Sequence, residues 1–397
     1  MKQYLQKLEG DKAIWAVAAL LAILSFLPVY SSSSNLAYLY GGNGNTLSYL
    51  LKHGMHLVLG FTIMFGVHKI PYNYFKALSI LALPVVAILL LYTLTQGTTI
   101  QGANASRWIQ IPFVGITFQT SALAMVVLLV YVARYLTKIK DKVITFKESI
   151  LPLWVPVFVI VGLILPANFS TAAIIFAMVI LLVFLGGYPI RYLLSVLGIG
   201  IVMLTIFVLS AKAFPDLFPN RVDTWISRVE SFTDAKSAEE GYQIEKAKIA
   251  IATGGVTGLG PGKSVQKNFL PQSSSDFIFA IIIEEFGLIG AILLLFLYML
   301  LLFRLLIVAN KALSTFGKLL VVAVGVPIVF QALINMAVAV ELFPVTGQTL
   351  PLISSGGTSI WMTCLALGII LSVSAKRKEE VKEEKQENPL DILSETI

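Results

Sequence analysis

Cysteine and charge are both scarce in this sequence. Its 397 residues hold one cysteine, Cys364, which excludes an internal disulfide framework. Only 13% of the residues are charged, whereas 57% are hydrophobic, and the mean hydropathy is +0.85. A soluble domain that exposed so much apolar surface would aggregate. A soluble enzyme, a disordered protein and a disulfide-stapled secreted domain are therefore excluded.

Histidine is equally rare, and the sequence shows no pattern of metal ligands. Two of its three histidines, His53 and His56, lie on one face of a predicted helix. No further His, Cys or Asp accompanies them, as a zinc site would require. We therefore predict no metal site there and expect a buried hydrogen-bonded pair or an interfacial placement.

Long apolar segments, by contrast, are abundant. A helix that crosses a bilayer needs about 20 apolar residues, and it satisfies its own backbone hydrogen bonds in lipid. The sequence predicts an all-α polytopic membrane protein with ten transmembrane helices. We expect the fifth and sixth to be two separate helices joined by a tight turn at 166–169. The predicted spans are 14–30, 48–67, 76–95, 119–136, 151–166, 170–187, 192–210, 277–303, 318–339 and 356–374.

Basic residues are concentrated in alternate loops, which predicts the orientation. The side that carries both termini is rich in lysine and arginine, whereas the short loops of the other side carry only Arg107. Because basic loops stay in the cytoplasm, we expect both termini there. The net charge of +7 then belongs to the membrane rim and implies no nucleic-acid partner. We divide the chain into a membrane domain, 1–375, whose large outer loop at about 211–275 joins helices seven and eight, and a charged cytoplasmic tail, 376–397.

Three polar clusters fall on the outer side, and the first is 102–109, where Arg107 precedes Trp108. The planar fork of an arginine suits a phosphate near the headgroups. An Arg-Trp pair also suits a simple interfacial anchor. On this motif alone both interpretations stay open.

The second cluster is the glycine-rich segment 254–264, which ends in Gly262-Lys263-Ser264. This ending resembles a nucleotide-binding loop, but Thr257 occupies the position of the first glycine and no strand precedes it. An NTPase is therefore excluded. We expect the glycines to let the backbone turn tightly and approach a ligand closely.

Asp276 follows this segment, at the entrance of a long apolar span. A carboxylate in that position is a functional candidate, and it can serve as a general base or acid. The alternative is helix capping, because Ser275 and Asp276 both favour the N-cap position. Glu284 and Glu285 follow inside the span, which predicts that this helix has a buried polar face.

The third cluster, 341–359, contains two prolines, three glycines and many hydroxyl groups. Irregular backbone at membrane depth is tolerated only when it is buried in protein or lines a wet cavity. We expect this loop to dip inward, with Gln331 and Asn335 of the preceding span facing the same cavity. An outward-facing polar cavity with one carboxylate and several basic groups suits a lipid-linked diphosphate as substrate.

The sequence resembles the SEDS family (shape, elongation, division and sporulation) over about 11–375. Members of that family have ten membrane helices and a large outer loop after the seventh. The resemblance rests on Gly102-Ala103 with Arg107-Trp108-Ile109, Gly241-Tyr242-Gln243, Asp276-Phe277-Ile278-Phe279 with Glu284-Glu285, and Pro344-Val345-Thr346-Gly347 with Leu350-Pro351, Ser354, Gly356 and Gly357.

This resemblance implies a peptidoglycan glycosyltransferase in the bacterial cytoplasmic membrane, which polymerises lipid II into glycan strands at the outer face. It implies that Asp276 takes the proton from the acceptor sugar hydroxyl, or orients that hydroxyl or a divalent cation, Mg²⁺ or Mn²⁺. No other cofactor is implied. Arg107, Lys263 and Lys267 would stabilise the diphosphate as negative charge develops on it. The residues expected to bind substrate are Arg107, Lys263, Lys267, Thr346, Gly347 and Ser354.

The sequence departs from the family pattern at several positions. A family glutamate and a family lysine at the start of the fourth span are replaced by Ala122 and Met125. An aspartate after the fifth span is replaced by Asn168, and a tyrosine before the paired glycines by Ser355. Asp276 is present, which favours an enzyme over a catalytically silent division scaffold.

The stretch 68–79 looks more like the division members than the elongation members, so we expect a role in cell division, with elongation as the alternative. The family implies a class B penicillin-binding transpeptidase and other division proteins as partners, besides lipid II, the nascent glycan and membrane lipid. A flippase or transporter for lipid-linked precursors is the rival class. It would need polar groups that reach both faces, whereas the motifs here gather on the outer one.

Overall fold

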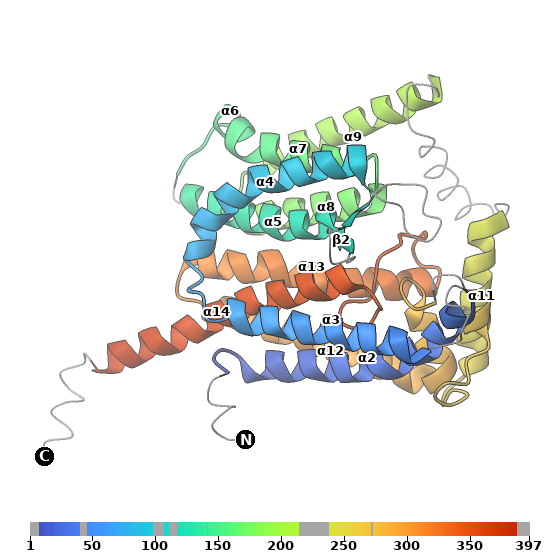
Figure 1. Cartoon of the computed structure of the whole chain (residues 1–397). Helices are drawn as coiled ribbons and strands as arrows, with labels where there is room; N and C mark the ends of the chain where they lie inside the picture. Colours follow the sequence, from blue (N-terminus) through green and yellow to red (C-terminus); the bar gives the residue numbers. More distant parts are fainter. Residues whose placement is uncertain are drawn as a thin grey trace, which may run out of the picture.

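The structure of the chain is a computed structural model, and the long elements that it describes are all helices (Figure 1). It describes residues 8–39, 46–97, 107–110, 117–140, 142–213, 238–270 and 273–386. In chain order the elements are α2 (Lys12–Leu39), α3 (Thr46–Val67), α4 (Tyr74–Gln96), β1 (Trp108–Gln110), β2 (Thr117–Gln119), α5 (Thr120–Ile139), α6 (Phe146–Ser149), the π-helix η1 (Ile150–Trp154), α7 (Val155–Ile164), α8 (Phe169–Leu185), α9 (Ile190–Ala213), α11 (Ala238–Gly254), the 3₁₀ helix η3 (Gln266–Asn268), α12 (Ile278–Lys311), α13 (Thr315–Ala339) and α14 (Gly357–Gln386).

Nine helices in this described part of the chain are long and apolar enough to cross a membrane. They match nine of the ten predicted spans, with bounds that shift by up to eight residues. The predicted sixth span is α8, an apolar helix of 17 residues. At about 1.5 Å per residue it is roughly 25 Å long, somewhat short of the hydrocarbon core of about 30 Å. The chain is a multi-pass membrane protein, and the number of ten spans stays a prediction.

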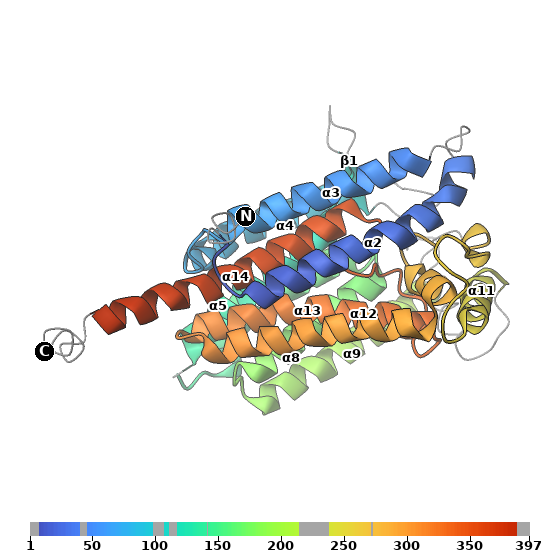
Figure 2. The ribbon, with the colours of Figure 1, turned by 90° about the horizontal axis from the view of Figure 1, so that it is seen from below.

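The helices lie side by side in one bundle (Figures 1 and 2). The central helix is α13, which packs against α5, α8, α12 and α14. Helix α14 pairs with α3, and α2 packs against both α3 and α12. The predicted separation of the fifth and sixth segments is confirmed: α7 ends at Ile164, α8 begins at Phe169, and Asn168 Oδ1 caps α8 by accepting from the Thr171 N–H at 3.2 Å.

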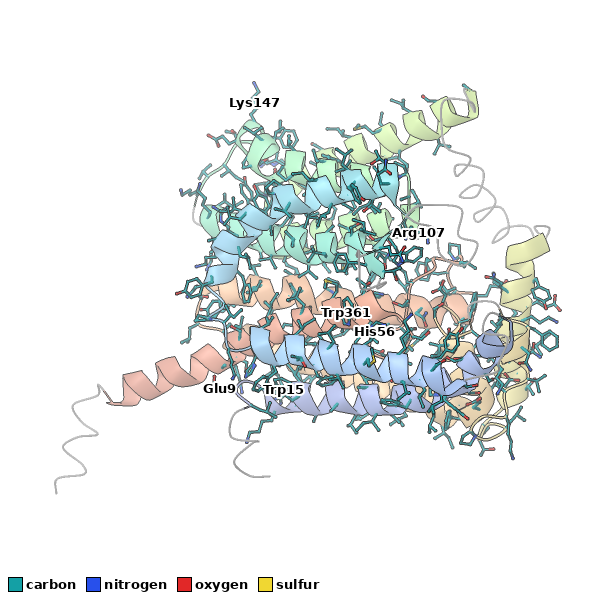
Figure 3. The ribbon with its side chains drawn as sticks, in the orientation of Figure 1. Glu9, Trp15, His56, Arg107, Lys147 and Trp361 are labelled. Carbon is teal, nitrogen blue, oxygen red and sulfur yellow. The ribbon has the colours of Figure 1, made fainter. Side chains whose placement is uncertain are left out.

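The start of α2 and the end of α14 lie at one end of the bundle, and α11 and β2 lie at the other (Figure 1). Glu9 and Trp15 mark the first end and Arg107 the second (Figure 3). The basic loops also meet at the first end, where Lys140 Nζ donates to Thr315 Oγ1 at 3.0 Å and joins α5 to α13. The uneven distribution of charge along the sequence therefore becomes a charge difference between the two ends of the bundle.

Helix α12 is longer than a membrane span requires and is broken near its start. Its 34 residues measure about 50 Å, against a hydrocarbon core of about 30 Å. Gly287 has φ +67° and ψ −165°, so the helical hydrogen-bond ladder is interrupted there. The part before Gly287 packs against α11 and carries the candidate site.

Candidate active site

Asp276 lies in the turn 273–277 that leads into α12, called the site turn below, and its side chain is half-buried. Helix α12 starts at Ile278, and its N-cap is Phe277, which makes no side-chain capping bond. The expectation that Ser275 or Asp276 caps this helix is therefore wrong. Both side chains stand before the cap position, because the turn continues through Phe277.

The irregular segment 340–356 dips back against the site turn, as its prolines and glycines predicted. Asn335, in α13, donates from Nδ2 to the Asp276 carbonyl at 2.8 Å and to the Gln348 carbonyl at 2.7 Å. Ser354 Oγ donates to the Ser275 carbonyl at 2.6 Å. Two neighbouring carbonyls of the site turn are thus held by side chains from other parts of the chain.

Gly347 places its backbone beside the Asp276 carboxylate. A β-carbon at position 347 would lie 3.4 Å from Asp276 Oδ2. Gly347 also has φ +65°, a conformation that residues with a side chain rarely adopt. Glycine at this position therefore permits the turn of the loop and keeps space next to the carboxylate.

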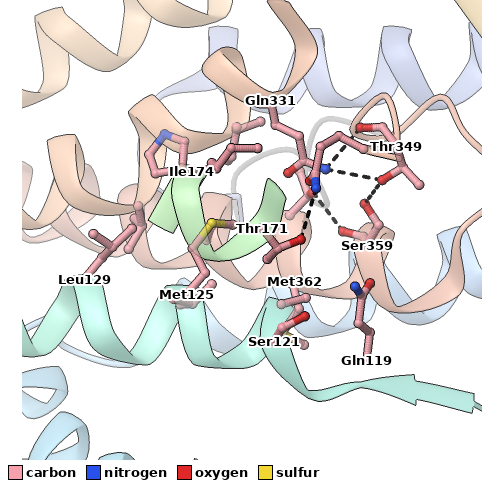
Figure 4. A pocket seen from close by; sticks show the side chains of 18 of the residues that line it. Gln119, Ser121, Met125, Leu129, Thr171, Ile174, Gln331, Thr349, Ser359 and Met362 are labelled. Carbon is pink, nitrogen blue, oxygen red and sulfur yellow. Dashed lines mark hydrogen bonds between the residues drawn. The ribbon is translucent and has the colours of Figure 1, made fainter. Parts of the chain in front are cut away.

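Gly347 also belongs to the wall of a cavity of about 70 Å³, which Asp276 itself does not line. It lies between α5, α8, α13, α14 and the loop 347–349. Polar side chains gather at one end and apolar ones at the other (Figure 4). The polar lining comprises Gln119, Ser121, Thr171, Gln331, Gln348, Thr349, Ser359 and Thr363, and the apolar lining includes Met125, Leu129, Ile174, Val324 and Ala366.

Hydrogen bonds between the loop and three helices shape the polar end of this cavity (Figure 4). Gln331 Nε2 donates to the Thr349 carbonyl at 3.0 Å, and Thr349 Oγ1 pairs with Ser359 Oγ at 2.8 Å. Gln348 Nε2 donates to Thr171 Oγ1 at 3.0 Å. The expected contribution of Gln331 to the cavity is confirmed. A cavity that is polar at the end near Gly347 and apolar at the other end suits an amphipathic ligand.

Two adjacent carboxylates in α12, Glu284 and Glu285, are fully buried, which confirms the predicted polar face. Glu284 accepts hydrogen bonds from Ser264 Oγ, from the Val265 N–H at 3.0 Å and from the Gln266 N–H at 3.2 Å. Buried acids are tolerated where such partners replace water. Glu284 therefore fixes the stretch of chain just before the site turn.

Lys267 completes the network around the second of these carboxylates. Its Nζ donates to Ser31 Oγ at 3.0 Å and to the Gly262 carbonyl at 2.8 Å. Ser31 Oγ in turn donates to Glu285. Lys267, which we predicted to bind the substrate, thus takes part in holding the glycine-rich segment against α2 and α12.

The glycine-rich segment packs into the break in α12. The Leu288 N–H donates to the Gly255 carbonyl and the Leu259 N–H to the Glu284 carbonyl, each at 2.9 Å. The loop therefore satisfies backbone groups that the break leaves without helical partners.

Glycine is required for this contact. A β-carbon at Gly254, Gly258 or Gly287 would lie within 2.2 Å of a carbonyl oxygen on the facing segment. The close approach predicted from these glycines is real, but its target is the α12 backbone. At Gly254 and Gly258 the facing backbone fills the space that a ligand would occupy. At Gly255 and Gly262 a β-carbon would meet no other atom, so the expected approach to a ligand stays a prediction there.

The three predicted basic ligands lie on different elements. Arg107 Nε donates to the Ala167 carbonyl at 3.1 Å, which ties the β1–β2 hairpin to the turn between α7 and α8. Lys263 is exposed on the glycine-rich segment, and Lys267 belongs to the Glu285 network. Their roles toward a substrate stay predictions.

The positions that depart from the family pattern have identifiable places in the structure. Ala122 and Met125 line the cavity, so neither contributes a charge to it. Asn168 caps α8. The Ser355 N–H donates to the Ser274 carbonyl at 2.9 Å, so this position also holds the site turn.

Some predicted features lie outside the described residues, and others stay predictions. Gly102, Ala103 and the stretch 214–237 of the outer loop are not among the described residues. Thr346 is half-buried beside Gly347. The division of the chain at 375 stays a prediction, and α14 continues past it to Gln386.

The two neighbouring histidines pack against different helices. His53 Nε2 meets Ser25 Oγ of α2 at 2.8 Å. His56 lies against Trp361 of α14, with 5.3 Å between ring centres. His53 is therefore buried and hydrogen-bonded, as expected, but its partner is Ser25 and not His56, because the face that the histidines share lies between two neighbouring helices.

The sequence did not indicate that Thr171 reaches the cavity, nor that Ser359 pairs with Thr349. Both are ordinary hydroxyl residues at the starts of apolar helices, and no local pattern sets them apart. Their role depends on how α8 and α14 pack around α13, which only the assembled fold shows.

Comparison with known proteins places the chain among proteins of similar length. It is 31% identical to the probable peptidoglycan glycosyltransferase FtsW of Nitrosococcus halophilus, with 92% of each chain covered. It is 32% identical to the protein of the same name from Geobacter sulfurreducens, with 93% of this chain and 96% of the relative covered.

Solved structures show the same architecture. One, described as the structural coordination of polymerization and crosslinking by a peptidoglycan synthase complex, matches with a TM-score of 0.70 and 26% identity, over 93% of this chain and 98% of that one. The rod shape determining protein RodA of Thermus thermophilus matches with a TM-score of 0.65 and 24% identity, over 93% and 97%. The family described as "Cell cycle protein", that of FtsW, RodA and SpoVE, matches residues 11–379, and the chain belongs to this family.

Proposed function

We propose that this chain is a peptidoglycan glycosyltransferase that polymerises lipid II into glycan strands during cell division. The observation that carries the proposal is the Asp276 carboxylate beside Gly347, a residue that also belongs to the wall of a cavity with one polar and one apolar end. A lipid-linked diphosphate sugar has the same division into a polar head and an apolar chain. The relatives named FtsW support the division role over elongation.

In the proposed reaction Asp276 accepts the proton of the acceptor sugar hydroxyl as its oxygen attacks the anomeric carbon of the donor sugar. The bond from that carbon to the diphosphate breaks, and the diphosphate leaves with the electron pair. Basic side chains would stabilise the charge that develops on it. The residues proposed to stabilise this charge or position the substrate are Arg107, Lys263, Lys267, Thr346, Gly347 and Ser354.

A divalent cation fits this site only together with substrate. Within the described ranges no three His, Cys, Asp or Glu side chains converge as metal ligands. Mg²⁺ is commonly held by one or two carboxylates, with phosphate oxygens and water as the other ligands. Asp276 can supply one carboxylate to such an arrangement, and the bound cation would add positive charge next to the diphosphate.

The volume of the cavity in this structure is too small for the substrate. Its volume of about 70 Å³ is well below the 300–1,000 Å³ or so of common ligand sites. Substrate binding therefore requires the helices around it to move apart. The wall is formed by four separate helices and a loop, so such a movement needs no unfolding of any of them.

The orientation we propose puts Asp276 on the outer face of a bacterial cytoplasmic membrane and both termini in the cytoplasm. The basic loops at the opposite end of the bundle support it. As partners we propose a class B penicillin-binding transpeptidase and other division proteins. The likeness to a structure that concerns polymerization and crosslinking by a peptidoglycan synthase complex supports the transpeptidase.

The test is the reaction of lipid II with the purified full-length chain and its transpeptidase partner in liposomes. We expect glycan polymer that is longer than the disaccharide unit. Movement of labelled lipid II across the bilayer without polymer would instead identify a flippase, and neither activity would identify a scaffold. The apolar inner end of the cavity disfavours the flippase, which needs a polar path for the diphosphate.

A further inference from the structure

A second cavity, of about 230 Å³, lies at the end of the bundle opposite Asp276. Its walls come from Gly10–Lys12 at the start of α2, from Arg304–Lys311 at the end of α12, and from Val373 and Ser374 of α14. The path along α12 from the site turn to Arg304 measures about 40 Å. A bilayer with its headgroups is about 40–45 Å thick, so this cavity lies at the level of the other leaflet's headgroups.

Basic side chains outnumber acidic ones in this cavity. Lys12, Arg304 and Lys311 line it together with a single carboxylate, Asp11. Asp11 is already engaged, because it pairs with Arg304 and its Oδ1 accepts from the Ala13 N–H at 2.9 Å. Neither lysine forms an ion pair with another described residue. The cavity therefore carries a surplus of positive charge that a bound anion would balance.

Asp11 positions Arg304 and engages only part of its guanidinium group. Its Nε donates to Asp11 Oδ1 at 3.3 Å, and Nη2 donates to Oδ2. A guanidinium group has five N–H donors, and the Arg304 side chain keeps 30% of its surface exposed. The remaining donors are held in a fixed fork, which suits the oxygens of a phosphate.

Apolar side chains that face outward adjoin the cavity. Phe303 and Leu306 of α12 are 60% and 45% exposed, on turns that also carry Arg304. In a bilayer these side chains contact acyl chains. A ligand with a phosphate in the cavity and acyl chains along α12 would satisfy both surfaces, whereas a free phosphate would use only the first.

We propose that this cavity binds the phosphate of an anionic phospholipid headgroup. Basic pockets between membrane helices recognise such headgroups through their charge. Helix α2 starts at this site, α12 ends there and α14 passes it, so a bound lipid would link the three helices at the end away from Asp276.

The test is binding of phosphatidylglycerol to the purified full-length protein in a neutral detergent, followed by native mass spectrometry. We expect tighter binding of this lipid than of phosphatidylcholine. Lys12→Gln with Lys311→Gln should weaken it about 30-fold, the factor for the loss of two basic residues at a membrane surface. Both lysines are exposed, so the variant should fold normally. Lys311→Arg keeps the charge and should keep the affinity.

A matched control removes the same charge from the same end of the bundle. Lys138 and Lys318 are exposed and lie outside the cavity, so Lys138→Gln with Lys318→Gln should leave binding unchanged. Equal losses in the two double variants would show attraction to the basic rim alone and overturn the site. Equal affinity for phosphatidylcholine would overturn recognition of the anionic headgroup. Displacement of the lipid by inorganic phosphate at equal concentration would overturn the assignment to a lipid.

Discussion

Gly347 meets Asp276 where the loop after α13 returns to the start of α12, and a β-carbon at position 347 would lie 3.4 Å from Asp276 Oδ2. Asn335 joins the same two segments, because its Nδ2 donates to the carbonyls of Asp276 and Gln348. The carboxylate is therefore positioned by parts of the chain that are far apart in sequence. The loop and the site turn act as one unit.

Gly347→Ala should lower the rate of glycan polymerisation while the protein still folds. The contact with Oδ2 is an ordinary van der Waals distance, so the strain comes from φ +65°, which costs an alanine about 1–2 kcal/mol. Relief of that strain shifts the loop, and a shift of about 1 Å at a reacting group can cost roughly 100-fold in rate. Gly356→Ala is the control, because its β-carbon would make only ordinary contacts. Equal rates for the two variants would contradict this role of Gly347.

Gly258→Ala should prevent stable folding of the outer segment, whereas Gly262→Ala should be tolerated. Both glycines have φ +78°, so the intrinsic strain of about 1–2 kcal/mol is shared. Only position 258 faces α12, where a β-carbon would lie 2.2 Å from the Glu285 carbonyl oxygen. The yield of monodisperse protein and its rate of thermal inactivation measure the difference. Similar behaviour of the two variants would show that the contact with α12 is not needed.

Glu284→Gln should loosen the segment that leads to the site turn. Ser264, Val265 and Gln266 all donate to this side chain, and an amide replaces one acceptor with a donor. Each buried donor that loses its partner costs about 1–3 kcal/mol. Limited proteolysis should therefore cut 255–270 at least about tenfold faster, since cleavage follows the population of the opened segment.

The control for this variant is Glu245→Gln, which changes an exposed carboxylate on α11. It should leave the rate of cleavage at 255–270 as it is in the original protein. Unchanged cleavage of Glu284→Gln as well would mean that the buried carboxylate does not hold the segment.

The helices and the inward loop could be predicted from the sequence because their signals are local. Apolar runs of bilayer length identify spans wherever they stand. Prolines and glycines in 341–359 mark irregular backbone, and irregular backbone beside lipid must be buried in protein. The buried polar face of α12 followed from Glu284 and Glu285, since two acids in an apolar span need partners.

The details of the site depend on contacts between segments that are distant in sequence. Such contacts could not be predicted from the sequence. The glycines of 254–262 signal a close approach, but glycine does not indicate whether a ligand or another backbone comes near. Asp276 suits an N-cap by residue type, yet the turn runs through Phe277. The cavity requires Thr171 and Ser359 to meet the loop after α13, and that meeting is set by helix packing.

The most direct test of the account is the rate of lipid II polymerisation by Asp276→Asn, compared with the original protein and with Glu245→Gln. Asparagine keeps the size of the side chain and removes the group that accepts a proton. A general base contributes about 100- to 10,000-fold to a rate, so we predict a loss of that order in Asp276→Asn, with normal yield and thermal stability. Glu245→Gln should polymerise at the original rate. Polymerisation by Asp276→Asn at a rate close to that of the control would contradict the proposed role of this carboxylate.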